Sequence, residues 1–207
     1  MNKTCLVKTS VANLYKTSSF KSELVTQALH NERLIILEQN QNWYKVRQWD
    51  DYESWIHSFY IHEIDDKNNI KSEDLSKHKN FSANNLIDTA QELLNIPYLW
   101  GGKSQLGFDC SGFVQTVFKT FGIYLPRDSY QQMNYKGLLE IKYSEACVGD
   151  LVFFSDDNKN VNHIAICIGN GEIIHSSGYV KIEKLKKNQE LYKKLYKVMS
   201  IKKIIDG

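Results

Sequence analysis

The sequence predicts an α+β protein in two parts, a small antiparallel β-barrel followed by a larger domain of helices and strands. Two observations favour this fold class. Short β-rich runs separated by polar turns fill residues 3–64, and amphipathic helical segments followed by further β-rich runs fill residues 83–207. The polar stretch between them is typical of a linker. We therefore expect a barrel at 1–64, a linker at 65–82 and an α+β domain at 83–207.

Composition and charge indicate a globular protein with no obvious polyanionic partner. Hydrophobic residues make up 42% and aromatic residues 12% of the 207-residue chain, enough for a buried core. Lysine and arginine number 26 against 24 aspartates and glutamates, a net charge of +2. This balance argues against nucleic acid and anionic membranes as partners and leaves a small polar ligand open.

Four scattered cysteines give no sign of a disulfide framework or a metal site. No pair shows C-x-x-C spacing, and no histidine stands at metal-ligand spacing. We therefore expect free thiols and neither a metal nor another cofactor. The cysteines are Cys5, Cys110, Cys147 and Cys167.

The N-terminal residues MNKTCLVKTSVANLY lack the apolar core of a secretory signal peptide. The longest aliphatic runs, such as LIIL at 34–37, are only as long as strands. If Met1 is the native start, these features predict a soluble cytoplasmic protein. The sequence does not specify an oligomeric state, and a monomer is the simplest expectation.

The barrel part contains short β-rich runs separated by turns such as Asn40-Gln41-Asn42 and Asp50-Asp51. This spacing is typical of a small antiparallel barrel. The runs are CLVKT (5–9), RLIILEQ (33–39), WYKVRQW (43–49), ESWIHS (53–58) and FYIHEI (59–64).

Two amphipathic helices are predicted in the second part. The first covers residues 84–95, where apolar residues recur on one face of a 3.6-residue period, and Pro97 should end it. The second runs from Cys110 to Phe121, with Gly122 as its C-terminal stop. Cys110 therefore stands at the start of a helix.

The rest of the chain turns to strands. The expected strands are DLVFF (150–154), HIAICIG (163–169), EIIHSS (172–177) and a C-terminal strand around LYKVMSIKKI (195–204). The lysine-rich stretch 181–197 also contains glutamates and leucines, which favours a solvated surface element over a nucleic-acid-binding patch.

Cys110 is the strongest candidate for a reactive residue. The free N–H groups and positive dipole end of a helix start favour a thiolate, so we expect a lowered thiol pKa, particularly beside an imidazolium. The same N–H groups could donate to an oxyanion during acyl transfer. The other three cysteines are expected to be small buried apolar residues.

A nucleophilic cysteine needs a base, and the base needs an orienting group. His163 and His175 lie on consecutive strands joined by Gly169-Asn170-Gly171, a strong hairpin signal. A regular two-residue loop would place the two histidines on opposite faces, whereas a three-residue loop, or a compensating bulge, would place them on one face. We predict one of the latter. The remaining histidines, His30, His57, His62 and His78, lie in the barrel and linker, where packing or exposed roles are expected.

Several motifs stand together in a familiar order. They are Tyr98-Leu-Trp-Gly-Gly, Phe108-Asp-Cys-Ser-Gly-Phe-Val, Gly122-Ile-Tyr-Leu-Pro-Arg and Gly149-Asp-Leu-Val-Phe-Phe, followed by the His163 and His175 strands. Over residues 83–207 this order resembles the NlpC-type cell-wall cysteine peptidases, papain-like α+β enzymes that cut the γ-D-glutamyl bond to a diamino acid in peptidoglycan stem peptides. The resemblance implies that Cys110 is the nucleophile, His163 the base, His175 its orienting group and Tyr98 an aid at the oxyanion.

The N-terminal part carries a second resemblance. VANLY, SELVTQAL and NWYKVRQWDDYESWIHSFY are similar to the bacterial SH3-like barrels that are fused to these peptidases. Arg127-Asp128-Ser129 is similar to the recycling-type members, which act in the cytoplasm on muropeptides with a free N-terminal L-alanine.

The recycling-type resemblance implies an amine pocket. The residues that would face the substrate amine are Asp128 and Glu23, and those that would line the pocket are Tyr52, Asp109, Ser111 and Ser129. A buried ammonium does need anionic or carbonyl partners. The alternative is that Glu23 is an exposed barrel residue and Asp128 caps a helix through SYQQM.

The expected function is a metal-independent cysteine peptidase whose partner is a small muropeptide. It would cut the stem peptide before the diamino acid, which is either diaminopimelate or lysine, and so release L-Ala-γ-D-Glu. Three alternatives remain open: a Cys-His acyltransferase or thioesterase, a non-catalytic binding module, and a secreted endopeptidase that acts on intact wall.

Overall fold

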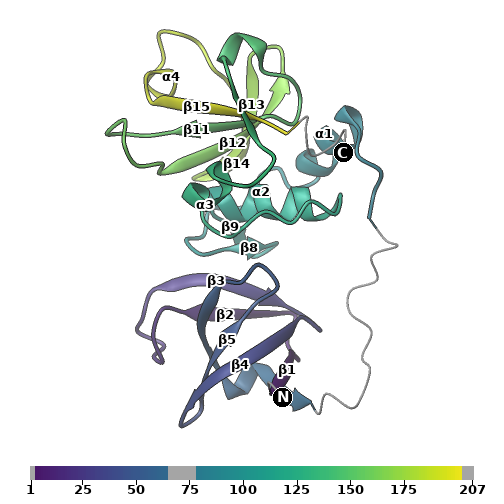
Figure 1. Cartoon of the computed structure of the whole chain (residues 1–207), viewed down its shortest axis with the longest axis vertical. Helices are drawn as coiled ribbons and strands as arrows, with labels where there is room; N and C mark the ends of the chain where they lie inside the picture. Colours follow the sequence, from purple (N-terminus) through teal and green to yellow (C-terminus); the bar gives the residue numbers. More distant parts are fainter. Residues whose placement is uncertain (1–2, 65–77, 202–207) are drawn as a thin grey trace.

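A computed structural model describes residues 3–64 and 78–201 of the chain. It contains a β-barrel and an α+β domain, which are stacked along the long axis of the molecule (Figure 1). The two parts meet where strand β3 of the barrel contacts the short strand β8 of the second domain. Most of the predicted linker, residues 65–77, lies outside the described residues, so the predicted domain boundaries stay a prediction.

The barrel is one antiparallel sheet in the strand order β3-β2-β6-β5-β4-β1-β7. Side chains from each strand form its core. In β2, for example, Ala12 and Leu14 are buried, and the neighbouring residues are only partly buried. Gln41 and Asp51 have positive φ angles of 52° and 61°, as the predicted turns require. The strands are β1 (Thr4–Val7), β2 (Val11–Tyr15), β3 (Leu24–Leu29), β4 (Arg33–Asn40), β5 (Trp43–Arg47), β6 (Glu53–His57) and β7 (Ile61–Ile64), with a 3₁₀ turn η1 (Ser58–Tyr60) before the last.

The second domain is built on a six-stranded antiparallel sheet in the order β10-β15-β11-β12-β13-β14, with a separate β8-β9 pair. Its strands are β8 (Lys103–Ser104), β9 (Gly107–Phe108), β10 (Leu139–Ile141), β11 (Leu151–Phe154), β12 (His163–Gly169), β13 (Glu172–Ser177), β14 (Tyr179–Lys184) and β15 (Leu195–Ser200). The helical segments are α1 (Ala83–Gln91), α2 (Cys110–Lys119), α3 (Ser129–Met133), α4 (Glu190–Lys193) and the 3₁₀ turn η3 (Tyr143–Glu145).

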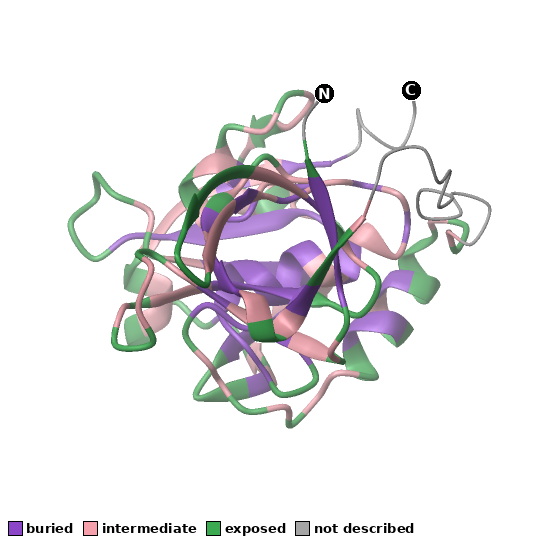
Figure 2. Ribbon diagram, turned by 90° about the horizontal axis from the view of Figure 1, so that it is seen from below, coloured by how far each residue is buried: buried purple, intermediate pink, exposed green. Residues whose placement is uncertain are grey.

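Helix α2 is the central element of this domain. It packs against β12 and β13, and its apolar face joins the same buried cluster as Ile164, Ile166 and Ile174. In Figure 2 the buried residues lie at the centre of the molecule and the exposed residues follow the outer loops. Gly122 follows the helix at φ 75°, a left-handed conformation that suits the predicted C-terminal stop.

Helix α1 ends at Gln91, four residues before the predicted end. The chain leaves the helical path because it pairs with the edge of the large sheet: Asn95 N–H donates to the Val180 carbonyl at 2.9 Å, and Val180 N–H donates to the Ile96 carbonyl at 2.8 Å. A contact with β14, rather than Pro97 alone, therefore ends the helix. Within the described residues, the helices are too short and polar for any of them to cross a membrane.

The lysine-rich stretch 181–197 contains structure that the sequence pattern did not predict. Strand β14 pairs with β13 over its whole length, and α4 follows it before the predicted C-terminal strand. Many of its lysines are exposed, as expected for a surface element, but Leu185 is buried, and so is Val180 directly before the stretch. The many charged residues in this stretch hid the alternation of buried and exposed side chains that identifies a half-buried edge strand.

Candidate active site

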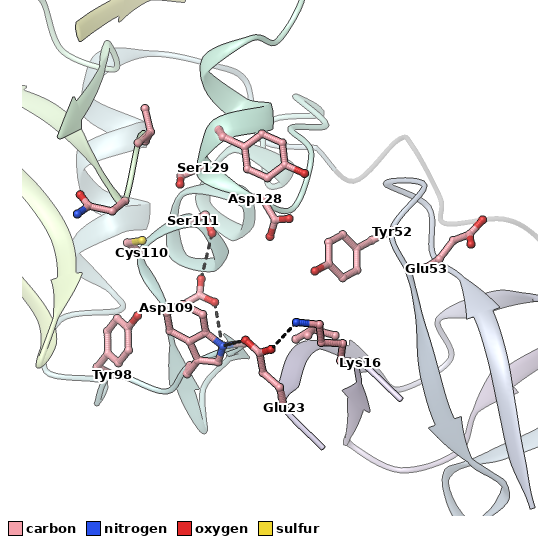
Figure 3. Close-up of a pocket in the computed structure, with 16 residues that line it drawn as sticks. Lys16, Glu23, Tyr52, Glu53, Tyr98, Asp109, Cys110, Ser111, Asp128 and Ser129 are labelled. Carbon is pink, nitrogen blue, oxygen red and sulfur yellow. Dashed lines mark hydrogen bonds and ion pairs between the residues drawn. The ribbon is translucent and has the colours of Figure 1, made fainter. Parts of the chain in front are cut away.

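Cys110 is the first residue of α2 and opens onto a cavity of about 530 Å³ between the two domains. Figure 3 shows barrel residues such as Tyr52 and Glu23 on one side and Cys110, Ser111 and Asp128 on the other. The predicted site residues that line this cavity are Cys110, Tyr98, Asp109, Ser111, Asp128, Ser129, Glu23 and Tyr52. Lys16, Trp100 and Tyr130 also line it, and the sequence pattern did not single them out.

The thiol of Cys110 lies at the beginning of β12. The backbone N–H of Ile164, the residue after His163, is close enough to stabilise the sulfur, as is that of Ser111. Val161 and Asn162, which precede His163, line the same cavity as Cys110. The fold therefore brings the first turn of α2 to the first residues of β12.

The protonation state of Cys110 differs from the expectation based on the helix start. Burial raises the pKa of its thiol to about 11, and the negative charge of Asp109 adds to the rise. The nearby backbone N–H groups and the Arg127 charge lower the pKa, but by less. The expectation of a lowered pKa is wrong because desolvation of the thiolate outweighs the helix end, which Asp109 already caps with a negative charge.

Asp109 fixes the start of α2. Its carboxylate accepts from the Gly112 N–H at 2.6 Å, from the Gly101 N–H at 3.0 Å and from the Ser111 hydroxyl at 3.2 Å. Arg127 donates to both of its oxygens. Asp109 and Ser111 thus line the cavity as predicted, but their polar groups are already bonded within the protein.

Arg127 connects this helix start to the barrel. Its guanidinium is 1% exposed and donates to Ser111 Oγ at 3.0 Å and to Thr26 Oγ1 of β3 at 3.1 Å. In the sequence, Arg127 stood out only as part of the Arg127-Asp128-Ser129 motif and had no predicted role of its own. A buried guanidinium needs this full set of acceptors, so helix α2 and the barrel share one polar network.

His163 and His175 contact each other directly. Nε2 of His163 and Nδ1 of His175 are 2.7 Å apart. The hairpin between them has a two-residue turn, with Asn170 and Gly171 at φ 54° and 72°. The predicted three-residue loop is therefore wrong.

The predicted alternative, a compensating bulge, is confirmed. Gly169 pairs with Glu172 and Cys167 with Ile173, which leaves Ile168 as the extra residue. Since Ile166 pairs with Ile174, the register places His175 opposite Ala165 and diagonal to His163 on the same face.

Both histidines are held in the neutral form. Burial lowers the pKa of His163 to about 3, and the neighbouring His175 contributes to the decrease. Burial also lowers the pKa of His175. Together with the raised thiol pKa, these shifts favour a neutral thiol and imidazole over a thiolate-imidazolium pair at neutral pH.

Tyr98 lines the cavity close to the sulfur. Burial, followed by the negative charge of a Cys110 thiolate, raises the pKa of its phenol to about 12. The phenol therefore stays protonated at neutral pH and can donate a hydrogen bond, as a role at an oxyanion requires.

The predicted amine pocket lies at the barrel end of the cavity. Burial raises the pKa of the Asp128 carboxyl, and burial followed by the Asp128 charge raises the pKa of Tyr52 to about 12. Glu23 remains 41% exposed and accepts from Trp100 Nε1 at 3.0 Å and Lys16 Nζ at 3.2 Å. Negative charge therefore gathers around Tyr52.

Asp128 and Glu23 were predicted either to line the amine pocket or to serve as a helix cap and an exposed barrel residue. The structure is compatible with both. Asp128 is the N-cap of α3, and its N–H donates to Gln131 Oε1 at 3.1 Å, but it also lines the cavity. Ser129 is the first residue of that helix. Glu23 is a partly exposed barrel residue that also faces the cavity.

Glu183 is a member of the histidine cluster that the sequence pattern missed. Its Oε2 is 2.8 Å from His175 Nε2 and 2.9 Å from Lys181 Nζ. Alternation along 180–183 could have shown that Lys181 and Glu183 share a face, had the stretch been predicted as a strand. Across 3–64 and 78–201, the His, Cys, Asp and Glu side chains form no group of three that could hold a metal ion.

Comparison with protein families assigns both parts of the chain. Residues 95–200 match the model of the NlpC/P60 family, and residues 14–58 match the bacterial dipeptidyl-peptidase SH3 domain. The crystal structure of an NlpC/P60 family protein from Bacillus cereus superposes with a TM-score of 0.53 at 30% identity and covers 95% of this chain and 62% of its own. The predicted fold class, an SH3-like barrel followed by a papain-like α+β peptidase domain, is thereby confirmed.

Two curated relatives are similar in sequence. A gamma-D-glutamyl-L-lysine dipeptidyl-peptidase of Bacillus cereus is 33% identical over 177 residues, 83% of this chain and 49% of the relative. The protein of the same name from Bacillus subtilis is 37% identical over 116 residues, 55% of this chain and 38% of the relative. The chain thus spans about half or less of the length of these relatives. On the match over residues 95–200, the chain belongs to the NlpC/P60 family of cysteine peptidases and carries a bacterial SH3 domain before it.

Proposed function

We propose that this protein is a cysteine peptidase that hydrolyses the γ-D-glutamyl bond to a diamino acid in peptidoglycan stem peptides. The observation that carries the proposal is the position of the Cys110 thiol beside the start of β12. The first residue of this strand is His163, which is hydrogen-bonded to His175. The names of the two Bacillus relatives support a γ-D-glutamyl bond to a diamino acid as the bond that is cut.

In the proposed reaction His163 acts as the general base. Nε2 of His163 is used by the contact with His175, so Nδ1 is the nitrogen available to the thiol. Because the resting pair is neutral, the thiol gives its proton to His163 as the sulfur attacks the γ-carbonyl carbon. Backbone N–H groups at the start of α2 and the Tyr98 hydroxyl would donate to the oxyanion.

The second half of the reaction returns the proton. His163 protonates the leaving amine of the diamino acid as the carbon–nitrogen bond breaks, which leaves a thioester on Cys110. His163 then takes a proton from water, the hydroxide attacks the thioester, and the thiol is regenerated with a free γ-carboxylate. None of these steps requires a metal ion.

We further propose that the substrate carries a free N-terminal L-alanine. Asp128, Glu23 and the Tyr52 hydroxyl surround the barrel end of the cavity and could pair with its ammonium. A free amine marks a peptide already detached from the glycan, so the proposed role is recycling of small muropeptides in the cytoplasm. The four free cysteines support a reducing compartment.

The proposed function can be tested by mass spectrometry of products from tri- and tetrapeptides with free or acetylated N-termini. We expect L-Ala-γ-D-Glu from the free peptides and much slower cleavage of the acetylated ones, with full activity on the free peptides in the presence of a chelator and none in Cys110→Ala. Comparing diaminopimelate with lysine peptides then identifies the diamino acid.

Each alternative predicts a different result. Equal cleavage of free and acetylated peptides would remove the amine pocket from the proposal, and cleavage of intact wall would favour an endopeptidase. Transfer to an added amine would favour an acyltransferase. Peptide binding without turnover would favour a binding module.

A further inference from the structure

Glu183 ends a line of polar side chains that crosses three neighbouring strands. His175 on β13 pairs with Lys181 on β14, and the register places His163 and Glu183 diagonally on either side of His175, on the same face. The two links in the line are 2.7 Å, between the histidine rings, and 2.8 Å, between His175 and the carboxylate. The arrangement reaches from the start of β12 to the edge of the sheet.

The carboxylate at one end determines where every proton in this line lies. An ionised carboxylate only accepts hydrogen bonds, so Nε2 of His175 must carry a hydrogen. In a neutral ring the other nitrogen, Nδ1, is then bare and accepts from Nε2 of His163. Nδ1 of His163 is consequently left without a hydrogen.

We propose that Glu183 is a positioning residue of the peptidase site, holding His163 in the tautomer whose bare Nδ1 can accept the Cys110 proton. The inference rests on the proposed function for its catalytic consequence, but the tautomer itself follows from the hydrogen-bond line. Loss of the carboxylate would allow His175 to carry its hydrogen on Nδ1. His163 would then present an N–H to the thiol and could not act as a base.

Two lysines lie near Glu183, and only one of these two contacts its carboxylate. Its carboxylate borders a cavity of about 370 Å³ whose other charged lining residues are Asp156 and Lys194. Those two side chains are paired with each other at 2.7 Å, so Lys194 does not compete for Glu183. Lys181 does contact the carboxylate, at the oxygen that also faces His175.

Lys181 makes a sharp test possible. In Glu183→Gln, the amide oxygen can occupy the position of Oε2, because both Lys181 and His175 donate there. We therefore expect Glu183→Gln to keep the tautomer, whereas Glu183→Leu should lose it. The double variant Lys181→Met/Glu183→Gln should also lose it, since the amide can then turn its NH₂ group to His175.

The experiment measures imidazole ¹⁵N chemical shifts of His163 and His175 in the full chain, together with kcat and KM on a free stem peptide. We expect Glu183→Leu and the double variant to change the tautomer signals and to lower kcat by roughly 100-fold with little change in KM. Glu183→Gln should keep kcat within roughly tenfold of the wild type. Glu172→Gln, at the other end of β13, serves as the matched control and should change neither.

The tautomer signals separate this inference from the proposed function. Unchanged tautomer signals and unchanged kcat in a folded Glu183→Leu protein would overturn the role of Glu183. A wild type that shows the predicted tautomers, loses them in Glu183→Leu and cleaves no stem peptide would overturn the proposed function instead.

Discussion

The Cys110 thiol experiences two opposing effects, and burial is the stronger. The helix start and nearby N–H groups favour the thiolate, but the site excludes water and the capping carboxylate of Asp109 lies beside the sulfur. The sequence identifies this residue because a cysteine at a predicted helix start is a local feature. The direction of its pKa shift depends on burial between distant segments, which a local pattern does not report.

The raised pKa predicts how Cys110 reacts with iodoacetamide. Only the thiolate is alkylated, so the rate should rise about tenfold per pH unit between pH 7 and 9 without a plateau. The measurement is the rate of mass increase in a Cys147→Ser background, because Cys147 is exposed and would also react; the expectation that it is buried is wrong. A rate that is already constant at neutral pH would mean that Cys110 exists as a thiolate-imidazolium pair.

The neutral state of His163 predicts a loss of stability in acid. Burial lowers the pKa of its imidazole from 6.5 to about 3, so between these values the unfolded chain binds a proton that the folded chain does not. The free energy of unfolding should therefore fall as the pH falls through this window, by about 2 kcal/mol from pH 6.5 to 5 for this group.

Urea unfolding of the wild type and His163→Gln at the two pH values isolates that contribution. The wild type should lose more stability than the variant, which lacks the titrating ring. An equal loss in both proteins would show that His163 is protonated in the folded state.

At the scale of elements, local signals in the sequence predicted the elements that surround Cys110. Apolar periodicity and a glycine stop located α2, and β-rich runs around Asn170-Gly171 located the β12–β13 hairpin. The end of α1 and the existence of β14 depend on pairing between residues far apart in sequence. Glu183 was missed for that reason, because its role exists only once β14 lies beside β13.

Arg127 predicts that the helix start and the barrel are stabilised together. Arg127→Met would leave the Asp109 carboxylate buried without its main counter-charge, and we expect a loss of about 3 to 5 kcal/mol in the free energy of unfolding. Arg47→Met is the matched control, because it breaks an exposed pair with Glu53 and should cost less than about 1 kcal/mol. Urea unfolding of both variants measures the difference, and equal losses would refute a special role for Arg127.

At the scale of the whole molecule, the barrel forms part of the cavity wall. Gln27 of β3 accepts from the Lys103 backbone N–H at 3.0 Å, and Asp50 accepts from Gln115 of α2 at 2.8 Å. The sequence predicted the two domains and, through resemblance, the residues that would meet between them. It did not predict these contacts, because each joins residues more than 60 positions apart, and the polar residues involved are of types that are ordinary on a surface.

The shared cavity predicts that amine selectivity requires one acidic residue from each domain. Asp128→Asn removes a charge but keeps a good N-cap for α3, and Glu23→Gln removes the barrel charge while retaining an acceptor for Trp100. Each change should lower kcat/KM for the free-amine peptide roughly 10- to 100-fold, because a charge-assisted bond to the ammonium is lost. Activity on an acetylated peptide should remain unchanged, since it has no ammonium to bind.

The pH dependence gives the same prediction an independent check. Burial raises the pKa of Asp128, so its carboxylate is lost at a higher pH than that of an exposed aspartate. KM for the free-amine peptide should therefore rise as the pH falls, and this rise should be smaller in Asp128→Asn. Glu38→Gln, an exposed barrel variant on β4, should behave as the wild type throughout. If Asp128→Asn lowers activity on free and acetylated peptides equally, Asp128 serves the fold of α3 and does not recognise the substrate amine.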